Sequence, residues 1–145
     1  PTAGLDPLVR REVLQGVLEA VSDEGGAVIY ASHLVHDIER VADNVVFLDE
    51  GRKRFEASVD HLKETTRRAR AVFADGAPES IQIEGKIDAQ ADGRVLTVVA
   101  EDPSRDLDSR LRSLGASEVQ VESISLEEIL IAFLRTENGP EAAGV

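Results

Sequence analysis

The chain has no cysteine, methionine or tryptophan, and only 1 tyrosine and 4 phenylalanines among its 145 residues. The lack of cysteine excludes disulfide bonds, thiolate metal ligands and cysteine nucleophiles, and it is typical of a reducing compartment. With so few aromatic rings there is no platform on which nucleic-acid bases could stack. No run approaches the roughly 18 apolar residues that cross a bilayer, and no charged-then-apolar leader is visible. We therefore expect a soluble, cytoplasmic protein.

Basic side chains are scarce relative to acidic ones. The sequence holds 28 Asp and Glu against 16 Lys and Arg, which gives a net charge of −12. Because affinity for nucleic acid depends on cations that neutralise phosphates, we expect no nucleic-acid partner. The hydrophobic share of 42% is enough to fill the core of one ordinary domain or of two small ones.

The first part of the chain, up to about residue 57, has the pattern of an α/β domain. After a loop that contains Pro and Gly, Asp6 stands where it can cap a helix from Pro7 to about Ser22. The continuous apolar run from Ala27 to Ala31 predicts a strand covered on both faces in a parallel sheet, and Ser32-His33 follows its carboxyl end. A short helix is expected over 34–41, a second strand over 44–48 and a hairpin return over 52–57.

From Ser58 onward the hydrophobic pattern changes from continuous to alternating, and we place a domain boundary there. A polar, basic helix over 58–70 is expected to link the two parts. The residues that follow predict a small accessory α+β domain over 71–138, and we expect a disordered tail over 139–145.

Within 71–138 we expect three strands, a helix, a fourth strand and a final helix. The strands are expected over 71–73, 80–87, 94–100 and 118–122, with a tight turn at Asp92-Gly93, and the helices over 104–114 and 126–134. Ser125 and Glu128 have the spacing of a capping box at the start of the last helix. This order fits a ferredoxin-like fold whose first helix is reduced to a loop.

Three short motifs occur in a characteristic order in the first part of the chain. They are Gly4-Leu5-Asp6-Pro7, the Ser32-His33 pair after the predicted buried strand, and the segment DNVVFLDEG from Asp43 to Gly51. Together they resemble the D-loop, the H-loop with its switch histidine, and the strand-turn that follows it in ATP-binding cassette (ABC) ATPases. The resemblance covers residues 1 to about 57. It implies the C-terminal part of a P-loop NTPase domain, starting just after the Walker B Asp-Glu pair.

The resemblance implies roles for two residues. His33 would contact the γ-phosphate of ATP, and an imidazole suits this role because both of its ring nitrogens can form hydrogen bonds. Asp6 would lie at the interface with a second ATPase subunit and couple the two nucleotide sites. The complete subunit would use ATP and Mg²⁺, form a homodimer, and bind a membrane permease subunit at the inner face of the cell membrane.

The end of the sequence adds a second resemblance. Its last predicted helix begins Ser125-Leu126-Glu127-Glu128 and continues with Ile129-Leu130. This segment is similar to the C-terminal extension on ATPase subunits of daunorubicin-resistance-type multidrug exporters. The similarity implies that the complete transporter exports a drug-like solute from a bacterial cell.

Other parts of an ABC ATPase have no counterpart in the sequence. It contains no Gly-x-x-x-x-Gly-Lys-Ser/Thr phosphate loop and no Leu-Ser-Gly-Gly-type signature. Without these motifs the chain cannot assemble the positioning and electrostatic stabilisation that phosphoryl transfer needs. We therefore expect this chain alone to be inactive and to carry no cofactor. We also expect it to self-associate, because its first helix and buried strands would expose apolar surface.

Some of these residues allow other interpretations. Asp6 can serve as a helix cap as well as an interface residue. His33 and Asp37 have the four-residue spacing of a metal-binding pair, but no third ligand is near them in the sequence, so we expect no metal site. Residues 58–145 could instead act as a dimerisation or ligand-sensing module. The complete protein could also be an ABC ATPase that serves something other than transport.

Two sets of residues in the accessory domain have competing interpretations. The apolar residues of the last helix either close the core of this domain or form an interface, and we favour the core. These residues are Leu126, Ile129, Leu130 and Phe133. The acidic residues near position 104 are expected to form a solvated surface. They are Glu101, Asp102, Asp106 and Asp108.

Overall fold

The computed structural model describes residues 6–23 and 26–136 of the chain. It forms two compact units, Pro1–Asp43 and Asn44–Val145, each of which is considered by itself. The hairpin that the sequence assigned to the first domain is thus grouped with the residues that follow it. The domain division near residue 57 stays a prediction.

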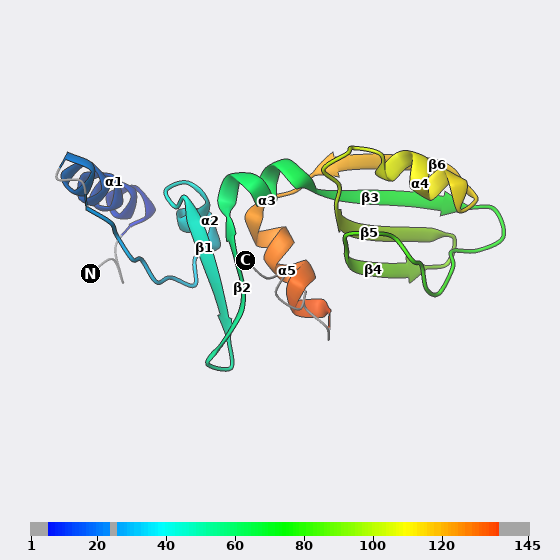
Figure 1. The fold of residues 1–145 in the computed structure, drawn as a ribbon, viewed down its shortest axis with the longest axis horizontal. Helices are drawn as coiled ribbons and strands as arrows, with labels where there is room; N and C mark the ends of the chain where they lie inside the picture. Colours follow the sequence, from blue (N-terminus) through cyan, green and yellow to red (C-terminus); the bar gives the residue numbers. More distant parts are fainter. Residues whose placement is uncertain (1–5, 24–25, 137–145) are drawn as a thin grey trace. The chain divides into compact units, whose positions relative to one another are not determined.

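The first unit contains two helices, α1 (Pro7–Asp23) and α2 (Val35–Glu39) (Figure 1). The predicted helix from Pro7 to about Ser22 is confirmed. The strand predicted over Ala27–Ala31 is wrong, because these residues have no regular secondary structure and Ile29 is fully exposed. A strand needs a neighbour that takes up its N–H and C=O groups, and no described segment pairs with this one.

The apolar residues of this unit remain accessible. Val9, Val13 and Val17 recur at four-residue steps on α1, and each is about two-fifths exposed. Apolar surface of this kind favours association. The expected self-association of the chain stays a prediction, and these valines are the surface on which it depends.

The second unit begins with a two-stranded antiparallel hairpin, β1 (Asn44–Asp49) and β2 (Arg52–Ser58). The two residues between the strands, Glu50 and Gly51, both have positive φ angles, of 48° and 75°. A type I′ hairpin turn requires this combination. The predicted strand and hairpin return are therefore confirmed.

A short helix, α3 (Val59–Thr65), follows the hairpin directly. Its N-cap is Ser58, whose hydroxyl accepts a hydrogen bond from the His61 N–H at 3.4 Å. The predicted helix over 58–70 is wrong in its second half, because the chain turns into strand β3 (Thr66–Phe73). Pairing on both sides, with β5 and β6, fixes this segment as a strand and overrides its local helix propensity.

The main sheet has four strands in the order β4-β5-β3-β6, and every neighbouring pair is antiparallel. Besides β3, its strands are β4 (Lys86–Asp92), β5 (Val95–Glu101) and β6 (Ala116–Ser123). It follows that β3 and β4 are parallel with β5 between them, and that β5 and β6 are parallel with β3 between them. This is the strand arrangement of a ferredoxin-like fold, in which residues 74–85 replace the first helix by a loop (Figure 1).

The strand predicted over 80–87 is wrong in position, because β4 begins only at Lys86. The residues before it bury Ile81 as a loop instead of pairing as a strand. The turn at Asp92-Gly93 is confirmed, and Gly93 has a φ of 58°. The register of β4 is therefore set by its turn to β5 and not by the apolar pattern that precedes it.

Two helices complete this unit, α4 (Leu107–Ser113) and α5 (Leu126–Arg135). Leu107 and Leu111 of α4 are fully buried against one face of the sheet. The sheet contributes mainly small and branched side chains to this core, with one aromatic ring: Ala69, Ala71, Phe73, Leu96, Val98 and Ala100. The face is lined mainly by Ala and Val, so α4 can lie close to the strands.

The last helix is also part of the core. Leu126 and Ile129 are fully buried and Phe133 is 7% exposed, so the prediction that this helix closes the domain is confirmed. The Phe133 ring lies 4.5 Å from that of Phe55, which in turn lies 5.6 Å from Phe47. Contacts between these rings therefore attach the β1-β2 hairpin to α5.

The loop before β4 lies close to the backbone of Glu101 at Gly85. Its φ is 73°, and a Cβ at this position would lie 2.5 Å from the carbonyl oxygen of Glu101. The Glu101 N–H donates to the Gly85 carbonyl at 2.8 Å, so the two backbones cannot separate without loss. We expect Gly85→Ala to lower the free energy of unfolding by about 2–3 kcal/mol in urea denaturation, because clash and φ strain add.

Gly93→Ala is the matched control for this prediction. Gly93 also has a positive φ, but a Cβ there meets nothing within 4 Å. The free energy of unfolding of Gly93→Ala should therefore fall by only about 1 kcal/mol, which is the cost of a left-handed backbone conformation for alanine. Equal losses in the two variants would show that the contact with Glu101 does not constrain the loop.

Candidate functional site

Asp6 precedes α1 directly and is exposed. It is thus in the position of an N-cap, where a carboxylate can accept from the first N–H groups of the helix and interact favourably with its dipole. The rest of the proposed D-loop motif, including Gly4 and Leu5, lies outside the described residues. The structure therefore places Asp6, an exposed residue, directly before the first residue of a helix.

His33 lies in a bend two residues before α2, and it is exposed. The bend is held by Ser32, whose hydroxyl accepts a hydrogen bond from the Leu34 N–H at 3.0 Å. This turn directs the chain into the helix and presents the imidazole to solvent. His33 and Asp6 are thus carried by separate turns of the first unit, each next to the start of a helix.

A metal site at His33 and Asp37 would require at least one further ligand. Within residues 6–23 and 26–136, no group of three or more His, Cys, Asp or Glu residues could hold a metal ion. The segment that carries the third motif, from Asp43 to Gly51, forms β1 and its turn, as the sequence indicated. The site residues themselves stay predictions.

Asp102 departs from its expected place on a solvated surface. Its side chain is buried, with the residue 2% exposed, so this prediction is wrong for Asp102. One carboxylate oxygen accepts from the Asp106 N–H at 3.0 Å and from the Arg110 guanidinium at 2.7 Å. The other accepts from the Leu107 N–H at 3.2 Å. The carboxylate compensates its burial by holding the start of α4, a role that becomes visible only when α4 folds back on the sheet.

Arg68 joins three elements on the other face of the sheet. Its guanidinium contacts Glu122 on β6 at 2.9 Å and Glu128 on α5 at 2.6 Å. The hydrogen bond from Arg68 to Glu122 is the main reason that the pKa of Arg68 is raised. The cluster fastens α5 to the sheet near the start of the helix.

Glu128 is also the second half of the capping box. Its carboxylate accepts from the Ser125 N–H at 3.0 Å, and the Ser125 hydroxyl accepts from the Glu128 N–H at 3.3 Å. The predicted capping box is confirmed. The pKa of Glu128 is lowered, first by the backbone hydrogen bond from Ser125, then by the Ser125 hydroxyl and by Arg68.

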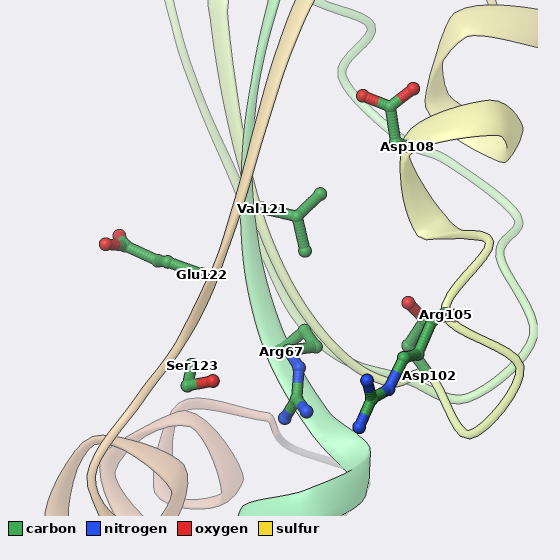
Figure 2. A pocket seen from close by; sticks show the side chains of 7 residues that line it. All are labelled: Arg67, Asp102, Arg105, Asp108, Val121, Glu122 and Ser123. Atoms are coloured by element: carbon green, nitrogen blue, oxygen red, sulfur yellow. The ribbon is translucent and has the colours of Figure 1, made fainter.

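A pocket of about 300 Å³ opens beside α4 and β6 (Figure 2). Its side chains come from three places: the start of β3, the loop and first turn of α4, and the end of β6. They are Arg67, Asp102, Arg105, Asp108, Val121, Glu122 and Ser123. No motif in the sequence pointed to this pocket, because it forms where distant segments meet.

The capping box generates a prediction about acid stability. Because the folded-state pKa of Glu128 is lowered from its ordinary value of 4.5, the ionised form stabilises the fold above that pH. We expect Glu128→Gln to lower the free energy of unfolding at pH 7 by about 1 kcal/mol. The difference from the native chain should shrink below pH 4.5, as Glu128 itself becomes protonated.

The measurement is urea denaturation from pH 7 to pH 3, with Glu127→Gln as control. Glu127 is the exposed neighbour of Glu128 in the same helical turn, and no partner of its carboxylate is found in the described part of the chain. Its variant should track the native chain at every pH. A loss in Glu128→Gln that does not depend on pH would show that its charge is not what stabilises the start of α5.

Similarity to known proteins indicates the class of protein to which the motifs of this chain point. No protein-family model matches the chain. Similar proteins are ATP-binding proteins of ABC transporters, which are P-loop NTPases, and the resemblance seen in the motifs is thereby confirmed. The similarity supports the assignment of the chain to the C-terminal part of such a protein.

Three relatives illustrate the match. An uncharacterized ABC transporter ATP-binding protein, YdbJ of Bacillus subtilis (strain 168), is 28% identical over 125 residues, 86% of this chain and 40% of YdbJ. The ABC transporter ATP-binding protein YtrB of the same organism is 26% identical over 132 residues, 91% of this chain and 45% of YtrB. The energy-coupling factor transporter ATP-binding protein EcfA2 of Staphylococcus aureus (strain USA300) is 33% identical over 84 residues, 58% of this chain and 29% of EcfA2.

The chain spans less than half of the length of each of these relatives. The matches to the two Bacillus proteins cover most of this chain, so they extend through the accessory domain as well as the motif-bearing part. In residues 6–23 and 26–136, no helix is long and apolar enough to cross a membrane.

Proposed function

We propose that the chain is part of the ATP-binding subunit of a bacterial ABC transporter, and that the complete subunit hydrolyses ATP to drive export of a drug-like solute. The observation that carries the proposal is the order of Asp6, His33 and the β1 turn, in a chain whose relatives are ABC transporter ATP-binding proteins. The subunit would lie in the cytoplasm, at the inner face of the membrane. It would bind a second copy of itself and a membrane permease.

His33 is proposed to contact the γ-phosphate of bound ATP. An exposed imidazole on a short turn can donate a hydrogen bond to a phosphate oxygen while its other nitrogen is held by a neighbouring group. In phosphoryl transfer such a contact is worth most when charge develops on the γ-phosphate oxygens. His33 would thereby distinguish ATP from ADP.

Asp6 is proposed to act across the interface between two ATPase subunits. Asp6 is exposed directly before α1, and a carboxylate in such a position can both cap the helix and contact a partner subunit. Motion of this turn would then be transmitted along α1. The nucleotide would be bound by ATP-binding motifs that this chain does not contain, with Mg²⁺ as its counterion.

The test is ATP hydrolysis by the complete subunit that carries this segment, reconstituted with its permease. We expect His33→Ala to lower the rate by about a hundredfold while nucleotide binding is retained, since one transition-state contact is lost. His36→Ala is the matched control, because His36 is also exposed and lies three residues further along. Equal rates in native and His33→Ala subunits, or equal losses in the two variants, would contradict the assignment of His33.

The isolated 145-residue chain gives a complementary measurement. Because it lacks a phosphate loop, calorimetric titration with Mg-ATP should give no saturable heat. Saturable binding that disappears in His33→Ala would show that this part of the site holds nucleotide without the phosphate loop. That result would refute the expectation that this chain alone carries no cofactor.

A further inference from the structure

Several arginines of the second unit form ion pairs with a carboxylate. Arg68 contacts Glu122 and Glu128, and Arg110 and Arg112 contact aspartates at 2.7 Å.

Two arginines without such an ion pair, Arg67 and Arg105, line the pocket beside α4. Within the part of the chain that the structure describes, neither Arg67 nor Arg105 has an ion-pair partner. In the view of Figure 2 both guanidinium groups lie at the same end of the pocket, and the Glu122 carboxylate points away from them. The pocket thus presents two positive charges at one end.

The carboxylates at the pocket are already compensated. Asp102 is held by Arg110 and two backbone N–H groups, Asp108 contacts Arg112 at 2.7 Å, and Glu122 contacts Arg68. None of these three carboxylates is left to neutralise Arg67 or Arg105. In the described part of the chain, no ion pair therefore compensates the charges of Arg67 and Arg105 at the pocket.

Hydrogen bonds hold the guanidinium of Arg67 and the backbone of Arg105. Arg67 donates through Nη1 to the carbonyl oxygens of Lys63 and Thr66, at 2.9 and 2.7 Å, so its planar group is oriented with other N–H groups still available. Arg105 has a φ of 56°, an uncommon conformation for a residue with a side chain, and its N–H donates to the Asp102 carbonyl at 3.1 Å. The buried Asp102 thus supports the loop that presents Arg105.

From these observations we infer that the pocket binds a small, doubly charged oxyanion, with the phosphate group of a phosphate-bearing small molecule between Arg67 and Arg105. Guanidinium groups recognise phosphate through paired N–H donors, and two of them balance its charge of −1.5 to about −2 near neutral pH. The Ser123 hydroxyl and Val121 complete the lining, and the volume of about 300 Å³ suits a small ligand. The site would make the accessory domain a ligand-sensing module, independent of His33 and Asp6.

The test is NMR titration of the 145-residue chain with inorganic phosphate at pH 7.5, at constant ionic strength set with chloride. We expect saturable shifts at the backbone amides of Arg67, Arg105 and Ser123. Arg105→Gln should weaken binding at least about tenfold, since a charge-assisted hydrogen-bonding group is lost. Arg67→Gln should do the same. If that variant unfolds because it loses its backbone contacts, Arg105→Gln decides.

Arg70→Gln is the matched control, because Arg70 is an exposed arginine three residues along the same strand. Residues at odd separation on a strand point to opposite faces, so Arg70 lies on the face away from Arg67. Its variant should bind phosphate like the native chain. Equal weakening in Arg70→Gln, or the absence of saturable shifts in the native chain, would overturn the inference.

Succinate is the second probe, since it carries two negative charges on separated carboxylates. Weaker binding of succinate than of phosphate supports a phosphate-bearing ligand. Tighter binding of succinate, lost in Arg105→Gln, would overturn the choice of phosphate in favour of a dicarboxylate.

Discussion

The main sheet of the second unit depends on the pairing of one strand, β3, with neighbours on both sides. Thr66–Phe73 takes β5 along one edge and β6 along the other, so the backbone N–H and C=O groups of this strand have partners on either side. Because all neighbouring strands are antiparallel, β3 and β4 run in the same direction, and so do β5 and β6. The chain must therefore cross from one end of the sheet to the other between β3 and β4, and again between β5 and β6. A loop makes the first crossing and α4 the second.

The side chains of β3 alternate between the two faces of the sheet, and this alternation places two neighbouring arginines on opposite faces. Consecutive side chains on a strand point to opposite faces, so Arg67 lies on the side of α4 and Arg68 on the side of α5. On one face the guanidinium is neutralised by two glutamates and fastens a helix. On the other the guanidinium faces a pocket. Two adjacent residues of the same type thus have different roles because of strand geometry alone.

Burial of Asp102 connects the core to the pocket. A carboxylate that is 2% exposed needs strong partners, and it obtains them from Arg110 and the first N–H groups of α4. These bonds fix the loop that contains Arg105 and the helix that contributes Leu107 and Leu111 to the core. The same interaction therefore supports the fold and shapes the pocket.

The sequence alone determined the elements that rest on local chemistry. Helix α1, the Glu50-Gly51 and Asp92-Gly93 turns and the Ser125–Glu128 capping box follow from neighbouring residues, and each is present in the structure. The ABC ATPase resemblance likewise came from short contiguous motifs. Only tertiary structure decided that residues 66–70 form a strand, that residues 80–85 do not, and that Asp102 is buried. These outcomes depend on which distant segment lies alongside, and pairing and burial between distant segments leave no periodic signal in the sequence at either partner.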